Sequence, residues 1–362
     1  MALVQVVPRL PPAIDGIGDY ALNLAHQLRQ ELAQETHFVV GDPTWKGQQE
    51  IDGFPVSVVP SCSSAAILSL LRHDRVSLAP VLLHYVGYGY ARRGCPFWLV
   101  DGLQRWQSLS ANQALVTMFH ELHASGRPPW TSSFWLSPLQ RNLAARLARL
   151  SDRCLTNRQD YAKLLYKLSH GKHTEIPALP VFSSIGELEQ VLPLSERKRQ
   201  IVVFGSPSNR QRVYLDSLKE LEQTCQQLGI EEILDIGPST TVRLSTVNGV
   251  PVVELGQRSA DEISRILSET LAGFFNYNPQ YLAKSTIFAT YCAHGLLPVS
   301  AGCSVPVDGL EAGEHYWVPD TSTNSSDLSQ LQAIADRAHA WYQTHTLSVQ
   351  AKTFASLLSS KK

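Results

Sequence analysis

The 362-residue sequence predicts an α/β protein with two consecutive domains, each a mainly parallel β-sheet covered by helices. The chain is too long for one ordinary hydrophobic core and long enough for two. Short apolar runs alternate with segments of helical periodicity, which is typical of parallel-sheet architecture. The alternation pauses in the proline-containing segment 177–194 and then starts again.

In the first half of the chain, apolar runs predict strands at 3–7, 37–40, 56–59, 81–85 and 113–119. A polar, glycine-bearing loop at 11–19 follows the first strand, and apolar residues at helical spacing predict a helix at 20–32. The last strand delivers His120 to its C-terminal end. Ser137 as N-cap and Pro138 at the first helical position predict a helix that runs to residue 150.

In the second half, apolar runs predict strands at 200–204, 232–236, 250–255, 272–275 and 296–300. Helices are expected at 213–228, 284–293 and 328–358. Another should start at Ser259, where Glu262 completes a capping-box pattern. We expect an N-terminal domain at 1–182, a C-terminal domain at 183–340, and a tail at 341–362 that packs back on the N-terminal domain.

Composition excludes several classes of protein. The formal net charge of -1 offers no global field for nucleic acid, so we expect no nucleic-acid partner. The six scattered cysteines lack zinc-ligand spacing, and we expect buried free thiols and no metal site. The N-terminus lacks the features of a secretion signal, and no apolar run is long enough to span a bilayer. We therefore expect a cytoplasmic protein.

Four segments, in order along the chain, resemble the GT-B glycosyltransferases, in particular the large retaining family 4-like group that uses nucleotide-activated sugars. The segments are 16–25 (GIGDYALNLA), 118–121 (MFHE), 253–267 (a strand, Leu-Gly and a helix) and 289–300 (ATYCAHGLLPVS). The resemblance implies two Rossmann-like domains facing across a cleft. It also implies an acceptor site in the N-terminal domain and a nucleotide-sugar site in the C-terminal domain.

The first glycine loop is a candidate for sugar and acceptor binding. Gly16 and Gly18 allow close backbone approach, and the helix start near Asp19 and Tyr20 offers free N–H groups to an oxygen-rich ligand. The alternative is an ordinary βα turn with Asp19 as helix cap. The resemblance places the matching loop near the acceptor and the sugar phosphate.

His120 is the candidate catalytic residue, with a role in sugar binding and orientation rather than as a nucleophile. A neutral imidazole at a strand end could donate to a sugar hydroxyl or accept from one, while the alternative is a structural histidine. Glu121 is a further sugar-binding candidate that could equally cap a helix.

Aromatic residues supply further acceptor-site candidates. His84, Tyr85 and Tyr88 follow another strand, and aromatic rings can stack on sugar faces. The alternative is a buried aromatic turn. Trp130, in the segment 129–135, could form a second aromatic wall, a peripheral membrane contact, or a hydrophobic staple between elements.

The donor diphosphate is expected at two helix starts in the C-terminal domain. Guanidinium groups suit phosphate, and free N–H groups, a lysine and hydroxyls make a plausible phosphate seat. The candidates are Gly205, Ser206, Arg210, Arg212, Lys284, Ser285 and Thr286. The alternatives are solvated arginines and an ordinary serine cap.

One departure from the family pattern concerns the donor sugar. The family commonly carries two glutamates eight positions apart, and the matching positions here are Leu282 and Thr290. Neither residue is acidic, so this chain lacks the side chains that contact the donor sugar and ribose in the family.

The expected function is transfer of a sugar from a nucleoside diphosphate sugar to an acceptor hydroxyl, with retention and without a metal cofactor. The acceptor, whether saccharide, lipid-linked or small molecule, stays open. One alternative is an inactive GT-B sugar- or nucleotide-binding module or partner subunit. A dinucleotide-dependent oxidoreductase is disfavoured because no G-x-G-x-x-G follows a strand with the required acidic residue.

Overall fold

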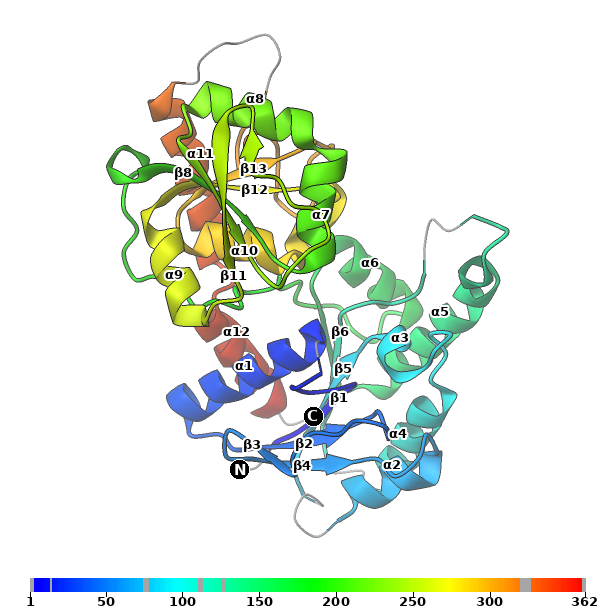
Figure 1. The fold of residues 1–362 in the computed structure, drawn as a ribbon. Helices are drawn as coiled ribbons and strands as arrows, with labels where there is room; N and C mark the ends of the chain where they lie inside the picture. The colour runs from blue at the N-terminus through cyan, green and yellow to red at the C-terminus, as the bar shows by residue number, and fades with distance from the viewer. Residues whose placement is uncertain are drawn as a thin grey trace. The chain divides into compact units, whose positions relative to one another are not determined.

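The computed structural model describes residues 3–13, 15–73, 78–109, 113–124, 128–319 and 327–359. Contacts between residues divide the chain into two compact units. Unit 1 comprises Met1–Leu179 and Leu347–Lys362, and unit 2 comprises Pro180–Thr346. Each unit has its own β-sheet with helices packed on it (Figure 1).

Seven strands form the sheet of unit 1, in the order β3-β4-β2-β1-β5-β6-β7. All neighbouring pairs are parallel except β3 and β4. The strands are β1 (Leu3–Val7), β2 (Thr36–Val40), β3 (Glu50–Ile51), β4 (Phe54–Val58), β5 (Val81–Tyr85), β6 (Leu115–Phe119) and β7 (Arg153–Thr156). β1, β5 and β6 are buried along their whole length, as expected for strands covered on both faces.

Helices cover both faces of this sheet. They are α1 (Gly16–Leu32), α2 (Ser64–Leu71), α3 (Gly87–Tyr90), α4 (Phe97–Leu109), α5 (Ser132–Leu150), α6 (Gln159–Leu168) and α12 (Leu347–Ser359). One apolar core joins β1 and β5 to α2, α4, α5 and α6. A second core joins β1, β2 and β4 to α1 on the other face. The C-terminal helix α12 packs beside α1, so residues from both ends of the chain build unit 1 (Figure 1).

Six strands form the sheet of unit 2, in the order β10-β11-β9-β8-β12-β13. Only the β10–β11 pair is antiparallel. The strands are β8 (Lys198–Phe204), β9 (Glu232–Ile236), β10 (Thr246–Val247), β11 (Val250–Gly256), β12 (Thr270–Phe275) and β13 (Leu297–Ser300).

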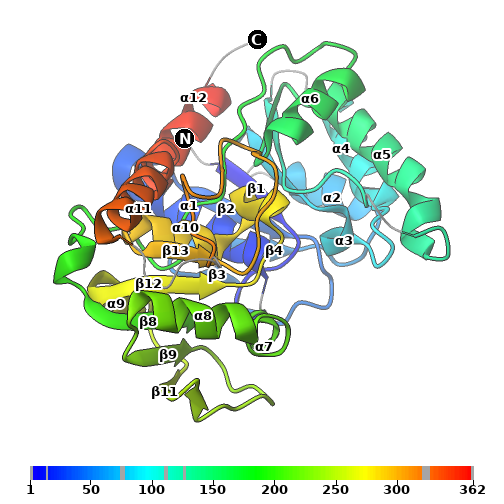
Figure 2. The same ribbon diagram turned by 90° about the horizontal axis from the view of Figure 1, so that it is seen from above.

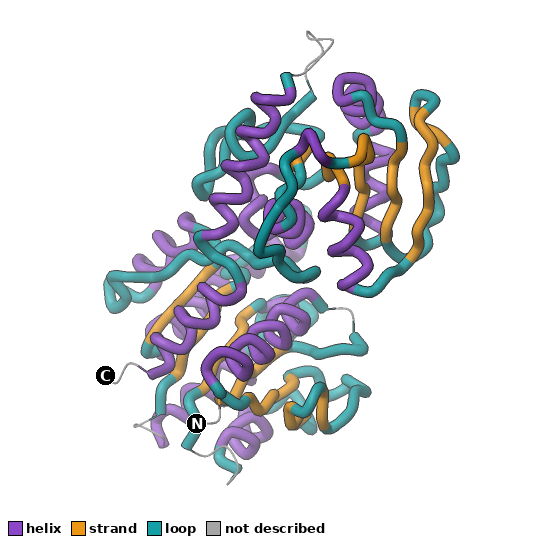
Figure 3. The backbone as a smooth tube through the Cα atoms, turned by 90° about the vertical axis from the view of Figure 1, so that its left-hand side faces the viewer, coloured by secondary structure: helices purple, strands orange, loops and turns teal. Residues whose placement is uncertain are grey.

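The helices of unit 2 also lie on both faces of their sheet, as Figures 2 and 3 show. They are α7 (Pro207–Asp216), α8 (Leu218–Leu228), α9 (Ala260–Glu269), α10 (Thr286–Ala293) and α11 (Leu328–Gln343), with short 3-10 helices at Leu194–Glu196 and Pro279–Lys284. One core unites β8, β9, β12 and β13 with α7, α8 and α11. On the other face, the hydroxyl of Tyr291 in α10 contacts the carbonyl oxygens of Val202 and Phe274.

The direction of chain growth reverses once in each sheet. In unit 1 the chain runs from β1 outward through β2 and β4, and then from β5 outward through β6 and β7. In unit 2 it runs from β8 through β9 to β11, and then from β12 to β13. Ligands of open α/β sheets bind at such switch points, outside the carboxyl ends of the strands. The relevant edges are those of β1 and β5 in unit 1, and of β8 and β12 in unit 2.

Most expected strands are confirmed, but several helix boundaries differ. The helix expected at 20–32 begins at Gly16, because the Asp15 side chain caps it by accepting from the backbone N–H of Ile17. The helix expected at 137–150 begins at Ser132 with Thr131 as N-cap, so Ser137 is not a cap and Pro138 lies inside the helix. Ser217 divides the helix expected at 213–228 into α7 and α8. The capping box of Ser259 and Glu262 is confirmed.

Two further expectations are corrected. The tail expected as one helix at 328–358 is two helices, α11 and α12, separated by residues 344–346. The six cysteines are free, but they are not all buried: Cys62 and Cys303 are exposed.

Candidate functional site

The switch point of unit 2 brings two helix starts to the ends of two strands. α7 follows β8, with Ser206 as its N-cap. α10 begins near the end of β12, with Ser285 as its N-cap. A small pocket lies there, lined by Phe204, Asn209, Val213, Phe274, Phe275, Asn276, Tyr277, Ser285 and Ile287. Backbone N–H groups in the first turn of a helix lack partners within the helix and carry a partial positive charge, so this edge suits an anion.

Gly205 lies against the side chain of Ile287, at the start of α10. Its φ is +130°, and a Cβ atom at this position would lie 2.7 Å from Cδ1 of Ile287. A side chain here would therefore strain the backbone and make the end of the Ile287 side chain move. The glycine predicted as a diphosphate contact thus lies at the edge of the sheet where the two helix starts meet.

The predicted triplet 284–286 does not open the helix together. Lys284 is half-buried and is the last residue of a 3-10 helix. Ser285 is buried, and its Oγ accepts from the backbone N–H of Phe288 at 3.2 Å. Thr286 is the first residue of α10 and is exposed. Lys284 therefore stands just before the helix start rather than in its first turn.

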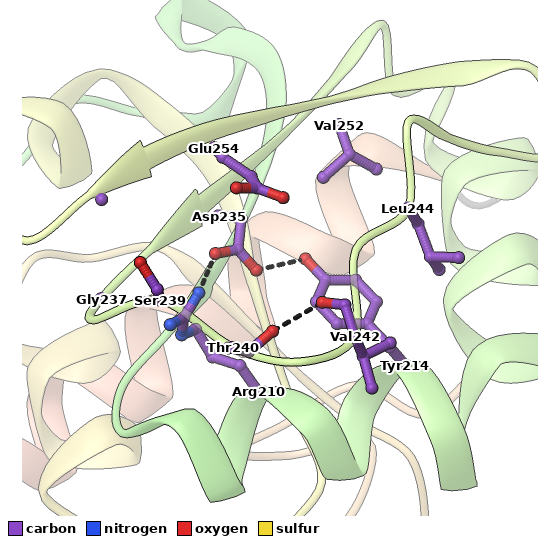
Figure 4. Close-up of a pocket in the computed structure, with 11 residues that line it drawn as sticks. Arg210, Tyr214, Asp235, Gly237, Ser239, Thr240, Val242, Leu244, Val252 and Glu254 are labelled. Carbon is purple, nitrogen blue, oxygen red and sulfur yellow. Dashed lines mark hydrogen bonds and ion pairs between the residues drawn. The ribbon is translucent and has the colours of Figure 1, made fainter.

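Arg210 belongs to a buried polar cluster, shown in Figure 4. Its guanidinium forms an ion pair with Asp235 at the end of β9 and donates to the carbonyl oxygens of Gly205 and Pro238. Tyr214, one turn further along α7, donates its hydroxyl to the other oxygen of Asp235 at 2.7 Å. Burial and the adjacent carboxylate raise the pKa of Tyr214 far above its usual value.

These contacts give Arg210 a structural role. Its guanidinium connects α7 to the loops that follow β8 and β9, and it is directed at protein carbonyls and a carboxylate (Figure 4). Gly237 completes the arrangement, since a Cβ there would lie 2.8 Å from Nε of Arg210. The expectation that Arg210 is either a direct phosphate ligand or a solvated arginine is therefore replaced by a buried ion pair. Arg212 is exposed and donates to Oδ1 of Asn209 at 2.6 Å.

In unit 1, the predicted glycine loop is the first turn of α1. Gly16 and Asp19 are exposed there, while Gly18 is buried. A Cβ at Gly18 would lie 2.4 Å from the carbonyl oxygen of Arg9, so the helix start packs directly on the segment after β1. Asp15, rather than Asp19, is the helix cap.

Tyr20, His84 and His120 come together in the interior of unit 1. Nδ1 of His84 lies 3.2 Å from Nε2 of His120, and the two rings are stacked at a centroid distance of 5.5 Å. The ring of Tyr20 meets both imidazoles edge-on, at 5.8 Å from His84 and 5.1 Å from His120. Burial lowers the pKa of His84 to about 3, so its imidazole is neutral near pH 7.

The remaining unit 1 candidates do not join this group. Tyr85 points into the apolar core, and its buried hydroxyl has no hydrogen-bond partner among the described residues. Tyr88 is exposed and donates its hydroxyl to Oγ of Ser133 at 3.1 Å. Glu121 is half-buried, and its backbone N–H contacts the carbonyl oxygen of Tyr85. Trp130 is 83% exposed just before α5.

Comparison with known proteins gives a clear answer for the fold only. No family model matches the sequence, and no curated protein matches it. Trehalose-6-phosphate synthase OtsA aligns over 100% of both chains with a TM-score of 0.61 and 11% identity. The lipopolysaccharide outer core galactosyltransferase WaaB, in its apo form, aligns over 99% of both chains with a TM-score of 0.56 and 9% identity. The chain has the GT-B fold.

A third similar structure is that of an α-glucosyltransferase in complex with UDP and a 13-mer DNA. It covers 98% of this chain and 99% of its own, with a TM-score of 0.55 and 12% identity. The predicted fold class, two Rossmann-like domains of the GT-B type, is therefore confirmed.

Within this GT-B fold, the two positions that the sequence comparison assigned to glutamates lie in the core. Leu282 is buried, and Thr290 is buried within α10. Oγ1 of Thr290 lies 3.2 Å from Oγ of Ser183, so its hydroxyl is paired inside unit 2. A carboxylate at either position would be desolvated without a cationic partner at these contacts.

Sequence reasoning missed four residues of the two polar clusters: Gln5, Tyr214, Asp235 and Gln350. Gln5, whose Oε1 lies 2.8 Å from Nε2 of His84, is the single polar residue in the buried strand LVQVV. Asp235 interrupts the buried part of the strand EILDI, so each was a usable signal. Gln350, whose Oε1 accepts from the hydroxyl of Tyr20, gave no such signal, because its position depends on how α12 packs on α1.

Two further features concern the described residues as a whole. None of their helices combines the length and the apolar character needed to cross a bilayer. The same residues contain no group of three His, Cys, Asp or Glu side chains placed to hold a metal ion.

Proposed function

We propose that this GT-B chain binds a nucleoside diphosphate sugar in unit 2 and transfers its sugar to an acceptor hydroxyl. The observation that carries the proposal is the switch point between β8 and β12, where α7 and α10 both begin. The fold shared with glycosyltransferases, one of them solved with UDP, supports it.

The diphosphate in this proposal is held by the first turns of α7 and α10 and by Lys284. Helix N-termini and a lysine supply hydrogen-bond donors and positive charge without the need for a metal ion. Ser206 and Thr286 stand at these helix starts with hydroxyl groups of their own. Arg210 does not contact the phosphate in this proposal. It stabilises the start of α7 through its ion pair with Asp235.

The transfer step breaks one bond and forms another. The bond from the anomeric carbon to the diphosphate breaks, the bond to the acceptor oxygen forms, and the acceptor proton passes to the departing phosphate oxygen. Retention of configuration is part of the proposal. The protein orients the reactants and stabilises the leaving charge. His120 contributes a contact to a sugar hydroxyl.

The second candidate function is a GT-B binding module or partner subunit without activity. It is favoured by one observation: Leu282 and Thr290 occupy the positions of the expected acidic pair and are part of the core. Such a chain would bind nucleotide or sugar without releasing nucleoside diphosphate.

Calorimetry with nucleoside diphosphates and nucleotide sugars, followed by a donor hydrolysis assay, separates the two candidates. We expect binding, and slow release of nucleoside diphosphate even without acceptor. Lys284→Ala should weaken nucleotide binding about tenfold, the value of one lost charge-assisted contact. The matched control is Lys219→Ala, an exposed lysine on α8. Nucleotide binding without release of nucleoside diphosphate would support the inactive binding module. Absence of nucleotide and nucleotide-sugar binding would exclude both candidate functions.

We also propose that unit 1 contacts an anionic membrane surface through the start of α5. Trp130, Phe134, Trp135 and Leu139 are exposed there, with Trp135 71% exposed. Arg141 is exposed on α5, and Arg92 and Arg93 are exposed in the segment between α3 and α4, where Nε2 of Gln140 contacts the carbonyl oxygen of Arg93. Segments 86–100 and 128–149 contain no acidic residue. Aromatic and basic side chains together suit the headgroup region of anionic lipids.

We also propose that the protein is cytoplasmic. All six cysteines are unpaired, including the exposed Cys62 and Cys303, which supports a reducing environment such as the cytoplasm.

A further inference from the structure

An open depression lies in unit 1 at the carboxyl ends of β1 and β2. These two strands are parallel neighbours, so the segments that follow them leave the sheet at the same edge. The depression has a volume of about 370 Å³, which is in the range of small-molecule sites. Its polar and aromatic lining residues come from these two segments and are Arg9, Asp42, Thr44, Trp45 and Lys46.

Asp42 holds the two segments together. Its Oδ2 accepts from Nε of Arg9 at 2.8 Å, and its Oδ1 accepts from the backbone N–H and the hydroxyl of Thr44 at 2.9 and 2.6 Å. The backbone N–H of Trp45 donates to the carbonyl oxygen of Asp42 at 3.1 Å, which closes the turn after β2. Of the described residues that line the depression, Asp42 is the one with a carboxylate, and both of its oxygens accept from protein donors.

Trp45 forms a fixed aromatic wall of the depression. Its Nε1 donates to the carbonyl oxygen of Leu10 at 2.7 Å, and its side chain packs on the apolar core beneath α1. The backbone of Gly47 lies against the six-membered ring, where a Cβ atom would clash with the indole. The ring is therefore ordered before any ligand binds, and an aromatic surface suits the apolar face of a sugar ring.

Arg9 and Lys46 bring positive charge to the depression. The side chain of Arg9 is 45% exposed, and its contact with Asp42 uses Nε. Lys46 is exposed as well. Within the part of the chain that the structure describes, no partner is found for Nη1 or Nη2 of Arg9 or for Nζ of Lys46. A guanidinium fork and an ammonium group with unused donors suit a phosphate or a carboxylate.

We propose that this depression binds a saccharide that carries a phosphate or carboxylate group. The sugar ring packs on Trp45, and the anionic group accepts hydrogen bonds from Arg9 and Lys46. A neutral saccharide gains only the aromatic contact, so the site selects acidic sugars. One point rests on the proposed function, which makes this saccharide the acceptor of the transferred sugar.

Calorimetry of the full chain without nucleotide tests the binding, with glucose 6-phosphate, glucuronate, glucose and inorganic phosphate as probes. We expect at least one of the two acidic sugars to bind tenfold or more tightly than glucose and inorganic phosphate, because only it engages both the ring and the cations. The tighter of the two identifies the anionic group, and its binding should weaken as salt is raised. Acidic sugars that do not bind, or that bind no more tightly than glucose or phosphate, would overturn the inference.

Variants locate the site. Lys46→Gln should weaken binding of the acidic sugar about tenfold, and the ammonium it removes has no contact in the described part of the chain whose loss could unfold the protein. Trp45→Leu should weaken it as well, through loss of the aromatic surface. Arg105→Gln, at an exposed site on α4, is the control and should bind like the wild type. Wild-type affinity in Lys46→Gln or in Trp45→Leu, or an equal loss in Arg105→Gln, would overturn the assignment.

The outcomes separate this inference from the proposed function. Acidic-sugar binding that Lys46→Gln weakens, in a chain that neither binds nor hydrolyses a nucleotide sugar, would support the site and overturn the proposed transfer. Nucleotide binding and donor hydrolysis in a chain that binds neither acidic sugar would overturn this inference alone.

Discussion

The hydroxyl of Tyr20 donates to Oε1 of Gln350 at 2.5 Å, which joins the first helix of the chain to the last. Both side chains are buried, and α12 lies alongside α1 in unit 1 (Figure 1). The C-terminal segment is therefore part of the structure that holds His84 and His120, because the same tyrosine ring packs on both histidines.

A double-mutant cycle tests this link. Tyr20→Phe and Gln350→Met should each destabilise the chain by about 1–2 kcal/mol, since each removes one partner of a buried hydrogen bond. The double variant should cost less than the sum by about 1 kcal/mol. Urea unfolding of the full chain measures these changes, with the exposed Tyr166→Phe as control. Additive effects would show that the two side chains do not interact.

The two arginines of α7 should behave differently. Arg210→Ala leaves the buried Asp235 without its cation and should destabilise the chain by about 3–5 kcal/mol, the cost of breaking a buried ion pair. Arg212→Ala, at an exposed site, should change stability by less than about 0.5 kcal/mol. Thermal unfolding gives both values. Wild-type stability in Arg210→Ala together with lost nucleotide binding would restore Arg210 as a phosphate ligand.

Acidification should weaken the fold through buried histidines. Burial lowers the pKa of His84 to about 3 and of His294 to about 4, below the ordinary value of 6.5. At a pH between the folded and the ordinary pKa, each histidine binds a proton in the unfolded chain and not in the folded one. The free energy of unfolding is therefore highest above pH 6.5 and falls as the pH is lowered. The loss approaches about 1.4 kcal/mol per histidine and pH unit.

Urea midpoints between pH 6.5 and 4.5 measure this loss. In the His294→Gln variant, stability should fall less steeply with decreasing pH, because the contribution of one histidine is missing. An equally steep loss of stability with pH in the wild type and the variant would contradict the lowered pKa of His294.

Membrane contact of unit 1 can be tested by co-sedimentation with vesicles. Vesicles of phosphatidylcholine with phosphatidylglycerol should retain the protein, and pure phosphatidylcholine should not. Trp130→Ser with Trp135→Ser should reduce binding about tenfold or more, because two interfacial anchors are lost. Leu215→Ser, at another exposed apolar site, in unit 2, is the control. Equal binding of all variants would exclude the start of α5 as the contact.

The fold could be predicted from the sequence because its signals are local. Short apolar runs such as Leu3–Val7 and Val81–Tyr85 can be recognised without knowledge of their neighbours. The capping box at Ser259 is equally local. Helix starts were less predictable where two caps compete: Thr131 starts α5 and Ser137 does not, and Ser137 donates instead to the carbonyl oxygen of Ala124.

The candidate sites were only partly predictable, because pairing in space decides the role of a charged side chain. Arg210, in α7, has the position of a phosphate ligand in the sequence. In the structure its guanidinium forms a buried ion pair with Asp235 of β9. Nothing in the local sequence links these two residues. Conversely, His84 lies in β5 and His120 directly follows the adjacent parallel strand β6, so their proximity does follow from the strand order.

The central claim is that a nucleoside diphosphate binds at the carboxyl ends of β8 and β12. Amide hydrogen exchange of the full chain, with and without UDP, GDP or ADP, tests it most directly. The account predicts that the nucleotide that binds will slow exchange at 205–210 and 284–289, the starts of α7 and α10. Protection confined to other segments, or none with any nucleotide, would contradict it.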